Sequence, residues 1–198
     1  MSAMANPFPP APATWRLPDR GKVAMAGLIV AESAIFTIFV VAYLFYVGKS
    51  LTGPTPREVL ETPIFYTICL LSSSLTIHLA AKCLARGIEF AFLGFWLLTI
   101  ALGGMFMYGT AQEWHRLIYE HGLTISTNLF GTTYYSLVGL HAFHVTAGLV
   151  MLVTVAVFGI KGRVGVRQSG RIEVLSMYWH FVDAVWGVVF TVVYVLGR

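Results

Sequence analysis

Charged residues are scarce in this chain: only 11% of its 198 residues are Asp, Glu, Lys or Arg, whereas 57% are hydrophobic. A soluble domain typically carries about 25% charged residues. The shortage argues against a soluble protein and, with a mean hydropathy of +0.75, indicates an integral membrane protein. The net charge of +4 is modest. Basic loops beside anionic lipid headgroups account for it without a nucleic-acid partner.

Cysteine is equally rare, and the motifs of nucleophilic catalysis are missing. Cys69 and Cys83 are 14 residues apart on one apolar segment. In a helix this spacing is about 21 Å, so the two thiols cannot form a disulfide with each other. The sequence has no Gly-x-Ser-x-Gly, no Gly-rich phosphate loop and no His-Glu-x-x-His. We therefore predict no catalytic residues in this chain.

The N-terminal 22 residues contain no apolar core of a secretory signal peptide, but they contain five prolines. We expect residues 1–22 to form an irregular cytoplasmic arm. Residues 23–198 are expected to form one membrane domain, since their length lies within the ordinary range of a single domain.

What the chain has in abundance is long apolar runs, each near the ~20 residues that a helix needs to cross ~30 Å of hydrocarbon. The five runs are Val23–Val47, Pro63–Ala81, Phe90–Tyr108, Phe130–Ile160 and Val174–Leu196. They predict an all-α bundle of five transmembrane helices.

Lys and Arg are distributed unevenly between the two sides of such a bundle. One side receives Arg16, Arg20, Lys22, Lys82, Arg86, Lys161, Arg163, Arg167 and Arg171. The other side receives Lys49, Arg57, Arg116 and Arg198. Because cytoplasmic loops carry the excess of positive residues, we expect a cytoplasmic N-terminus and a C-terminus outside.

Ionisable residues inside the apolar runs mark candidate functional positions, because they are costly there and usually face protein or water. The last run carries polar or small residues at helical spacing: Glu173, Ser176, His180, Asp183 and Gly187. They predict one polar stripe that faces other helices or lipid headgroups. Counting ~1.5 Å per residue places Glu32 and Asp183 both ~14 Å from the cytoplasmic side, so they could be neighbours. Glu32 could contact protons or lipid, or be a neutral structural acid.

A metal site is the next hypothesis to weigh. His141-x-x-His144 and His180-x-x-Asp183 together have the composition of a four-ligand set. By the same counting, His144 lies ~24 Å and His180 ~9 Å from the cytoplasmic side. Ligands must lie within ~2–2.2 Å of one metal ion, so we expect neither a metal nor a haem in this chain. Hydrogen bonding between helices is the alternative role for these side chains.

Several stretches, in order along the chain, resemble subunit III of haem–copper oxidases. These are Ala31–Phe36 around Glu32, Leu71–Thr76, Gln112–Trp114, Phe130–Val145 with His141 and His144, and Glu173 with Tyr178–Trp186. The resemblance covers roughly residues 23–198, and the last two stretches are the most specific.

The resemblance implies a non-catalytic accessory subunit of a proton-pumping cytochrome c oxidase in a prokaryotic plasma membrane. It implies packing on subunit I beside subunit II, haem and copper in those partner subunits only, bound phospholipid, and support of proton uptake and sustained turnover. Glu32 matches the family's carbodiimide-reactive carboxylate. The other intramembrane polar, lipid or interface candidates are His78, Glu113, His141, His144, Glu173, Trp179, His180, Asp183 and Trp186.

Two alternatives stay open at the level of sequence. The chain could instead accompany a quinol oxidase or a nitric oxide reductase, which have related five-helix subunits. It could also be a stand-alone transporter that uses Glu32, His180 and Asp183 as a proton relay, although five helices without a repeat are unusual for a transporter.

Overall fold

The computed structural model describes residues 19–50 and 53–197, and every regular element within these ranges is helical. The long helices are α1 (Arg20–Tyr46), α3 (Ile64–Ala85), α4 (Glu89–Tyr119), α5 (Leu129–Ile160) and α6 (Ser169–Phe190). The shorter elements are the single turn α2 (Pro56–Val59), the 3-10 turn η1 (Val166–Gln168) and η2 (Thr191–Leu196), which continues α6 as a π-helix. Across the described ranges, five helices are long and apolar enough to cross a membrane, as predicted.

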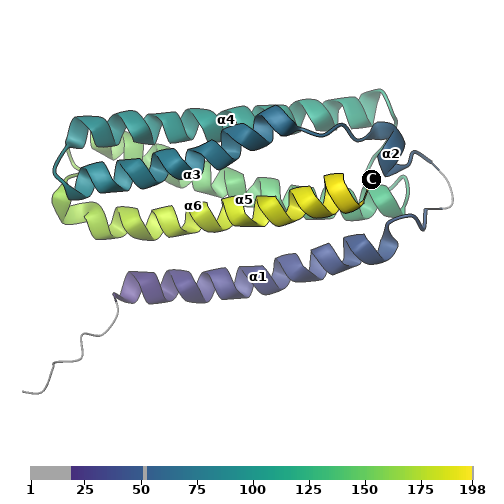
Figure 1. Cartoon of the computed structure of the whole chain (residues 1–198), viewed down its shortest axis with the longest axis horizontal. Helices are drawn as coiled ribbons and strands as arrows, with labels where there is room; N and C mark the ends of the chain where they lie inside the picture. The colour runs from purple at the N-terminus through teal and green to yellow at the C-terminus, as the bar shows by residue number, and fades with distance from the viewer. Residues whose placement is uncertain (1–18, 51–52, 198) are drawn as a thin grey trace, which may run out of the picture.

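The helices α3, α4, α5 and α6 form the body of the bundle, and α1 runs along one side of it (Figure 1). α1 packs against α5 and α6 and buries only Phe36 and Tyr43. Several of its large apolar side chains are exposed, among them Val30, Ile38 and Val41. α1 therefore offers an apolar surface to its surroundings.

The predicted helix boundaries need correction at several ends, and α3 for example runs past the predicted Ala81 to Ala85. α1 begins at Arg20, within the expected arm, because Asp19 Oδ1 accepts a hydrogen bond from the Gly21 amide at 2.7 Å and caps the helix. α4 runs past the predicted Tyr108 to Tyr119, and α6 begins at Ser169, before the predicted Val174. Hydropathy marks where apolar residues end, whereas backbone hydrogen bonds continue through polar residues. Residues 1–18 of the expected arm lie outside the described residues.

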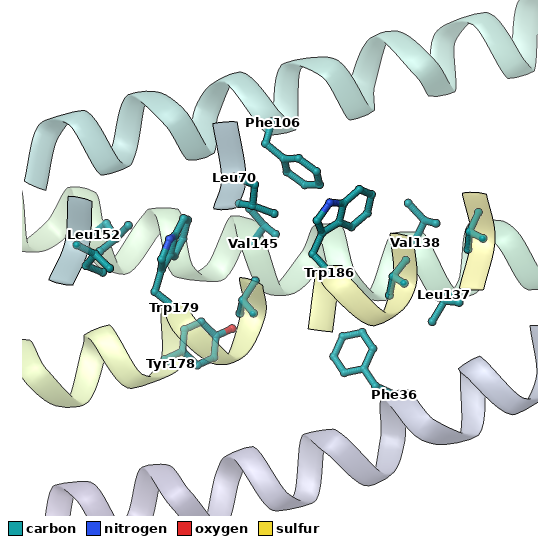
Figure 2. Packing of buried hydrophobic residues seen from close by; sticks show 14 of the residues in the cluster. Phe36, Leu70, Phe106, Leu137, Val138, Val145, Leu152, Tyr178, Trp179 and Trp186 are labelled. Atoms are coloured by element: carbon teal, nitrogen blue, oxygen red, sulfur yellow. The ribbon is translucent and has the colours of Figure 1, made fainter. Parts of the chain in front are cut away.

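Tryptophans fill the centre of the bundle. Trp96, Trp179 and Trp186 are fully buried, and Figure 2 shows Trp186 near Phe106 of α4. The rings of Trp186 and Phe106 meet edge to face, with their centroids 4.7 Å apart. A Cβ added at Gly103 would lie 2.9 Å from the Trp179 ring. The absence of a side chain at Gly103 therefore permits close packing of α4 against α6.

Candidate functional site

Glu32 on α1 and His144 on α5 form a pair in the interior of the bundle. Glu32 Oε2 lies 3.2 Å from His144 Nε2, and their side chains are 23% and 9% exposed. His144 Nδ1 lies 2.8 Å from the Leu140 carbonyl oxygen, which can only accept, so Nδ1 carries a proton. The Nε2 contact then needs one further proton, either on the imidazole or on the carboxyl. The geometry therefore allows the two side chains to share a proton across the Nε2–Oε2 contact.

Aromatic side chains surround this Glu32–His144 pair. The Phe36 ring centroid lies 5.1 Å from that of His144, and the Phe143 ring 5.6 Å from it. The Tyr178 hydroxyl donates to the His144 carbonyl oxygen at 3.1 Å, which ties α6 to α5 at this level. A surrounding of low polarity strengthens the contact between the two side chains.

Glu32 and Asp183, expected as possible neighbours, have different partners: Glu32 contacts His144, and Asp183 accepts from Ser74. The depths estimated from the sequence assumed that every apolar run ends at the same level of the membrane. α5 has 32 residues, more than a bilayer requires, so its end is a poor marker of depth.

A second cluster joins α3 to α6. Ser74 Oγ lies 3.0 Å from His180 Nδ1 and also donates a hydrogen bond to Asp183 Oδ2. Asp183 is only 4% exposed. Its Oδ1 atom has no hydrogen-bond partner among the described residues. The His78 ring on α3 lies 6.4 Å from that of His180.

The polar stripe predicted for α6 is therefore partly confirmed. Ser176 and Asp183 are buried in the bundle, and His180 is half-buried against α3. Glu173 instead forms an exposed ion pair with Lys22 of α1 at 2.8 Å, and Gly187 is exposed.

A third cluster lies at the opposite end of the bundle, near α2. The Tyr194 hydroxyl lies 2.8 and 3.0 Å from the two carboxylate oxygens of Glu113. One turn further along α4, Arg116 forms an ion pair with Glu61. Sequence reasoning selected Glu113 but not Tyr194, which lies on the buried face of the π-helical segment.

The remaining site candidates have packing contacts. His141 is fully buried, stacks on Trp186 at a centroid distance of 5.0 Å, and has no hydrogen-bond partner among the described residues. The indole nitrogen of Trp186 donates to Thr67 Oγ1 at 3.2 Å, and that of Trp179 donates to Ser73 Oγ at 2.8 Å. The two tryptophans therefore hydrogen-bond between helices, whereas the interhelical hydrogen bond expected as the alternative role of His141 is not seen among the described residues.

The two halves of the hypothetical metal set face different neighbours. His144 faces α1 through Glu32, whereas His180 and Asp183 face α3 through Ser74. Over residues 19–50 and 53–197, no group of three or more His, Cys, Asp or Glu side chains could hold a metal ion.

The chain is similar to known proteins over almost all of its length. Residues 22–198 match the family model described as Cytochrome c oxidase subunit III. The chain is 30% identical over 197 residues to cytochrome c oxidase subunit 3 of Bacillus subtilis, covering 98% of this chain and 95% of that protein. It is 37% identical over 184 residues to the Synechocystis subunit of the same name, covering 90% and 77% of the two chains.

A quinol oxidase subunit is similarly close. The chain is 36% identical over 175 residues to cytochrome bo(3) ubiquinol oxidase subunit 3 of Pseudomonas aeruginosa, covering 85% of this chain and 81% of that one. With five apolar helices and relatives of this kind, the chain is a multi-pass protein of a prokaryotic plasma membrane that associates with other oxidase subunits. It belongs to the subunit III family of the haem–copper oxidases.

Proposed function

We propose that this chain is the non-catalytic subunit III of a proton-pumping cytochrome c oxidase, packs on subunit I, and supports proton uptake and sustained turnover. The observation that carries the proposal is the Glu32–His144 pair. The pair places a carboxyl and an imidazole that can share a proton between α5 and α1, the long helix that the rest of the chain covers least. Haem and copper belong to the partner subunits, and this chain supplies none of their ligands.

The exposed face of α1 supports the packing part of the proposal. Side chains such as Val30, Ile38 and Val41 are 59% to 71% exposed. Such a face needs an apolar neighbour, and lipid acyl chains and subunit I are the two neighbours that an oxidase complex offers.

A groove between α1 and α6 supports the lipid part. It encloses about 290 Å³, and its apolar walls include Phe36, Val40, Phe181 and Val185. This lining suits an acyl chain of a structural phospholipid, since it offers few polar partners.

A quinol oxidase is the second candidate, because the Pseudomonas aeruginosa relative of similar identity bears that name. A stand-alone transporter is less well supported. Its three relay residues fall in two clusters, Glu32 with His144 and His180 with Asp183 through Ser74.

Purified oxidase with and without this chain tests the proposal. We expect both preparations to begin oxygen reduction, because the redox cofactors lie in the partner subunits. The preparation without the chain should lose activity sooner during continuous turnover and take up protons more slowly. Equal turnover lifetimes and equal proton uptake in the two preparations would contradict the proposal.

A further inference from the structure

A cavity lies between α3 and α6 at the basic end of the bundle, which is the end predicted to face the cytoplasm. It encloses about 450 Å³. His78 and Lys82 line it from α3, and Glu173, Ser176 and His180 line it from α6. A site of this size, with several polar side chains in its lining, has room for several water molecules.

A chain of three side chains leads inward from this cavity. His180 lines the cavity, and its Nδ1 lies 3.0 Å from Ser74 Oγ. The Ser74 hydroxyl donates in turn to Asp183 Oδ2. Because a hydroxyl has one proton, Ser74 must accept from His180 Nδ1–H when it donates to Asp183. The three groups then form one continuous chain of donors that ends on a carboxyl only 4% exposed.

We propose that the cavity and the chain His180–Ser74–Asp183 form a proton inlet, through which the buried Asp183 carboxyl exchanges protons with water at the α3–α6 opening. The inlet deepens the proposed role in proton uptake and rests on it. A proton that reaches the imidazole leaves Nδ1 for Ser74 Oγ, while the Ser74 hydroxyl proton passes to Asp183 Oδ2. The imidazolium becomes neutral, the carboxylate becomes a carboxylic acid, and no further reactant is consumed.

The charges around the cavity are mixed rather than uniformly positive. α3 contributes His78 and Lys82, whereas α6 contributes the Glu173 carboxylate, which is paired with Lys22 of α1 at 2.8 Å. A phosphate in the cavity would face this carboxylate, which disfavours an anionic headgroup relative to water. The His78 ring also lines the cavity, with its centroid 6.4 Å from that of His180.

Infrared spectroscopy of the intact oxidase complex tests the inlet. A protonated carboxylic acid has a characteristic carbonyl stretching band. If such a band is lost in Asp183→Asn, it belongs to Asp183. This variant retains side-chain volume and a partner for Ser74. We expect the band to appear as the pH falls and to shift rapidly after transfer into heavy water. Ser74→Ala should slow that shift by about tenfold or more, because it breaks the chain.

Ser72→Ala is the matched control, since Ser72 is exposed on the same helix and its hydroxyl makes no hydrogen bond within the described ranges. It should leave the exchange rate unchanged. The inlet is overturned if Ser74→Ala exchanges as fast as the parent, or if no acid band depends on Asp183 at any pH. It is also overturned if a phospholipid occupies the cavity instead of water. Mass spectrometry would then find a bound phospholipid that is lost in His78→Phe and retained in Ser72→Ala.

The same preparations separate this inference from the proposed function. An Asp183 band that behaves as expected, in a complex whose proton uptake is unchanged by Asp183→Asn, would support the inlet. The same result would show that the inlet does not contribute to proton uptake by the oxidase during turnover. If the oxidase without this chain takes up protons more slowly, but Ser74→Ala leaves the exchange rate at Asp183 unchanged, the proposed function stands and the inlet is overturned.

Discussion

His144 Nε2 lies 3.2 Å from Glu32 Oε2, while its other ring nitrogen is already bonded to the Leu140 carbonyl oxygen. The two bonds fix the ring orientation and leave one proton to be shared between imidazole and carboxyl. α1 is the least covered helix of the bundle, and this contact is its main polar link to α5.

Glu32→Gln should leave the complex assembled and abolish carbodiimide labelling of this chain, because the amide keeps a hydrogen bond to His144 but has no reactive carboxyl. The loss of interhelical stability should be small, about 0.6 kcal/mol. Mass spectrometry of the labelled chain measures the result. Glu173→Gln, which removes an exposed carboxylate, is the control. Labelling that persists at the parent level in Glu32→Gln would assign the reactive group to another residue, such as Asp183.

Gly103→Ala should destabilise the chain, because its Cβ would lie 2.9 Å from the buried Trp179 ring. Overpacking of this kind costs about 1–3 kcal/mol. Gly104→Ala is a close control, since nothing lies within 4 Å of the added Cβ. Thermal unfolding of the detergent-solubilised complex should separate the two variants. Equal midpoints would show that the Trp179 ring moves aside without cost.

Tyr194→Phe should destabilise the end of the bundle near α2. The buried Tyr194 hydroxyl is the group that contacts both carboxylate oxygens of Glu113. Its removal should cost about 1–3 kcal/mol, because the Glu113 carboxyl loses a buried hydrogen-bond partner. Hydrogen exchange along η2 should increase. Tyr119→Phe, at a position that is 76% exposed, should leave that exchange as it is.

Glu58 gives the α2 turn a pH dependence. The Thr55 amide donates to Glu58 Oε2 at 2.9 Å, and this bond lowers the pKa of the Glu58 carboxyl below its ordinary value of 4.5. Because the folded pKa is the lower one, the stabilisation is complete above pH 4.5 and is lost as the pH falls through the lowered value. Hydrogen exchange of the α2 peptide should therefore accelerate at acidic pH. In Glu58→Gln this acceleration should be absent, and an unchanged acceleration would exclude Glu58 as its cause.

Sequence patterns predicted the parts of this molecule that depend on hydropathy and helical spacing. The five helices follow from apolar runs of sufficient length. The placement of His180 and Asp183 against another helix follows from their spacing on one face.

The sequence could not predict in the same way which side chains contact each other within each cluster. Glu32 pairs with His144 because of how α1 and α5 are offset along their axes, which their lengths do not determine. Ser74 is one of three consecutive serines, and successive helical residues point about 100° apart. Only the position of α6 selects Ser74 as the partner of His180 and Asp183.

Purification of the chain through an N-terminal tag in mild detergent is the most direct measurement, with visible spectroscopy and mass spectrometry of the chains that accompany it. A cytochrome c oxidase predicts haem a signals together with subunit I and a copper-binding subunit II. Haem with no copper-binding donor subunit would indicate a quinol oxidase instead. A colourless chain without oxidase partners would contradict the proposed function.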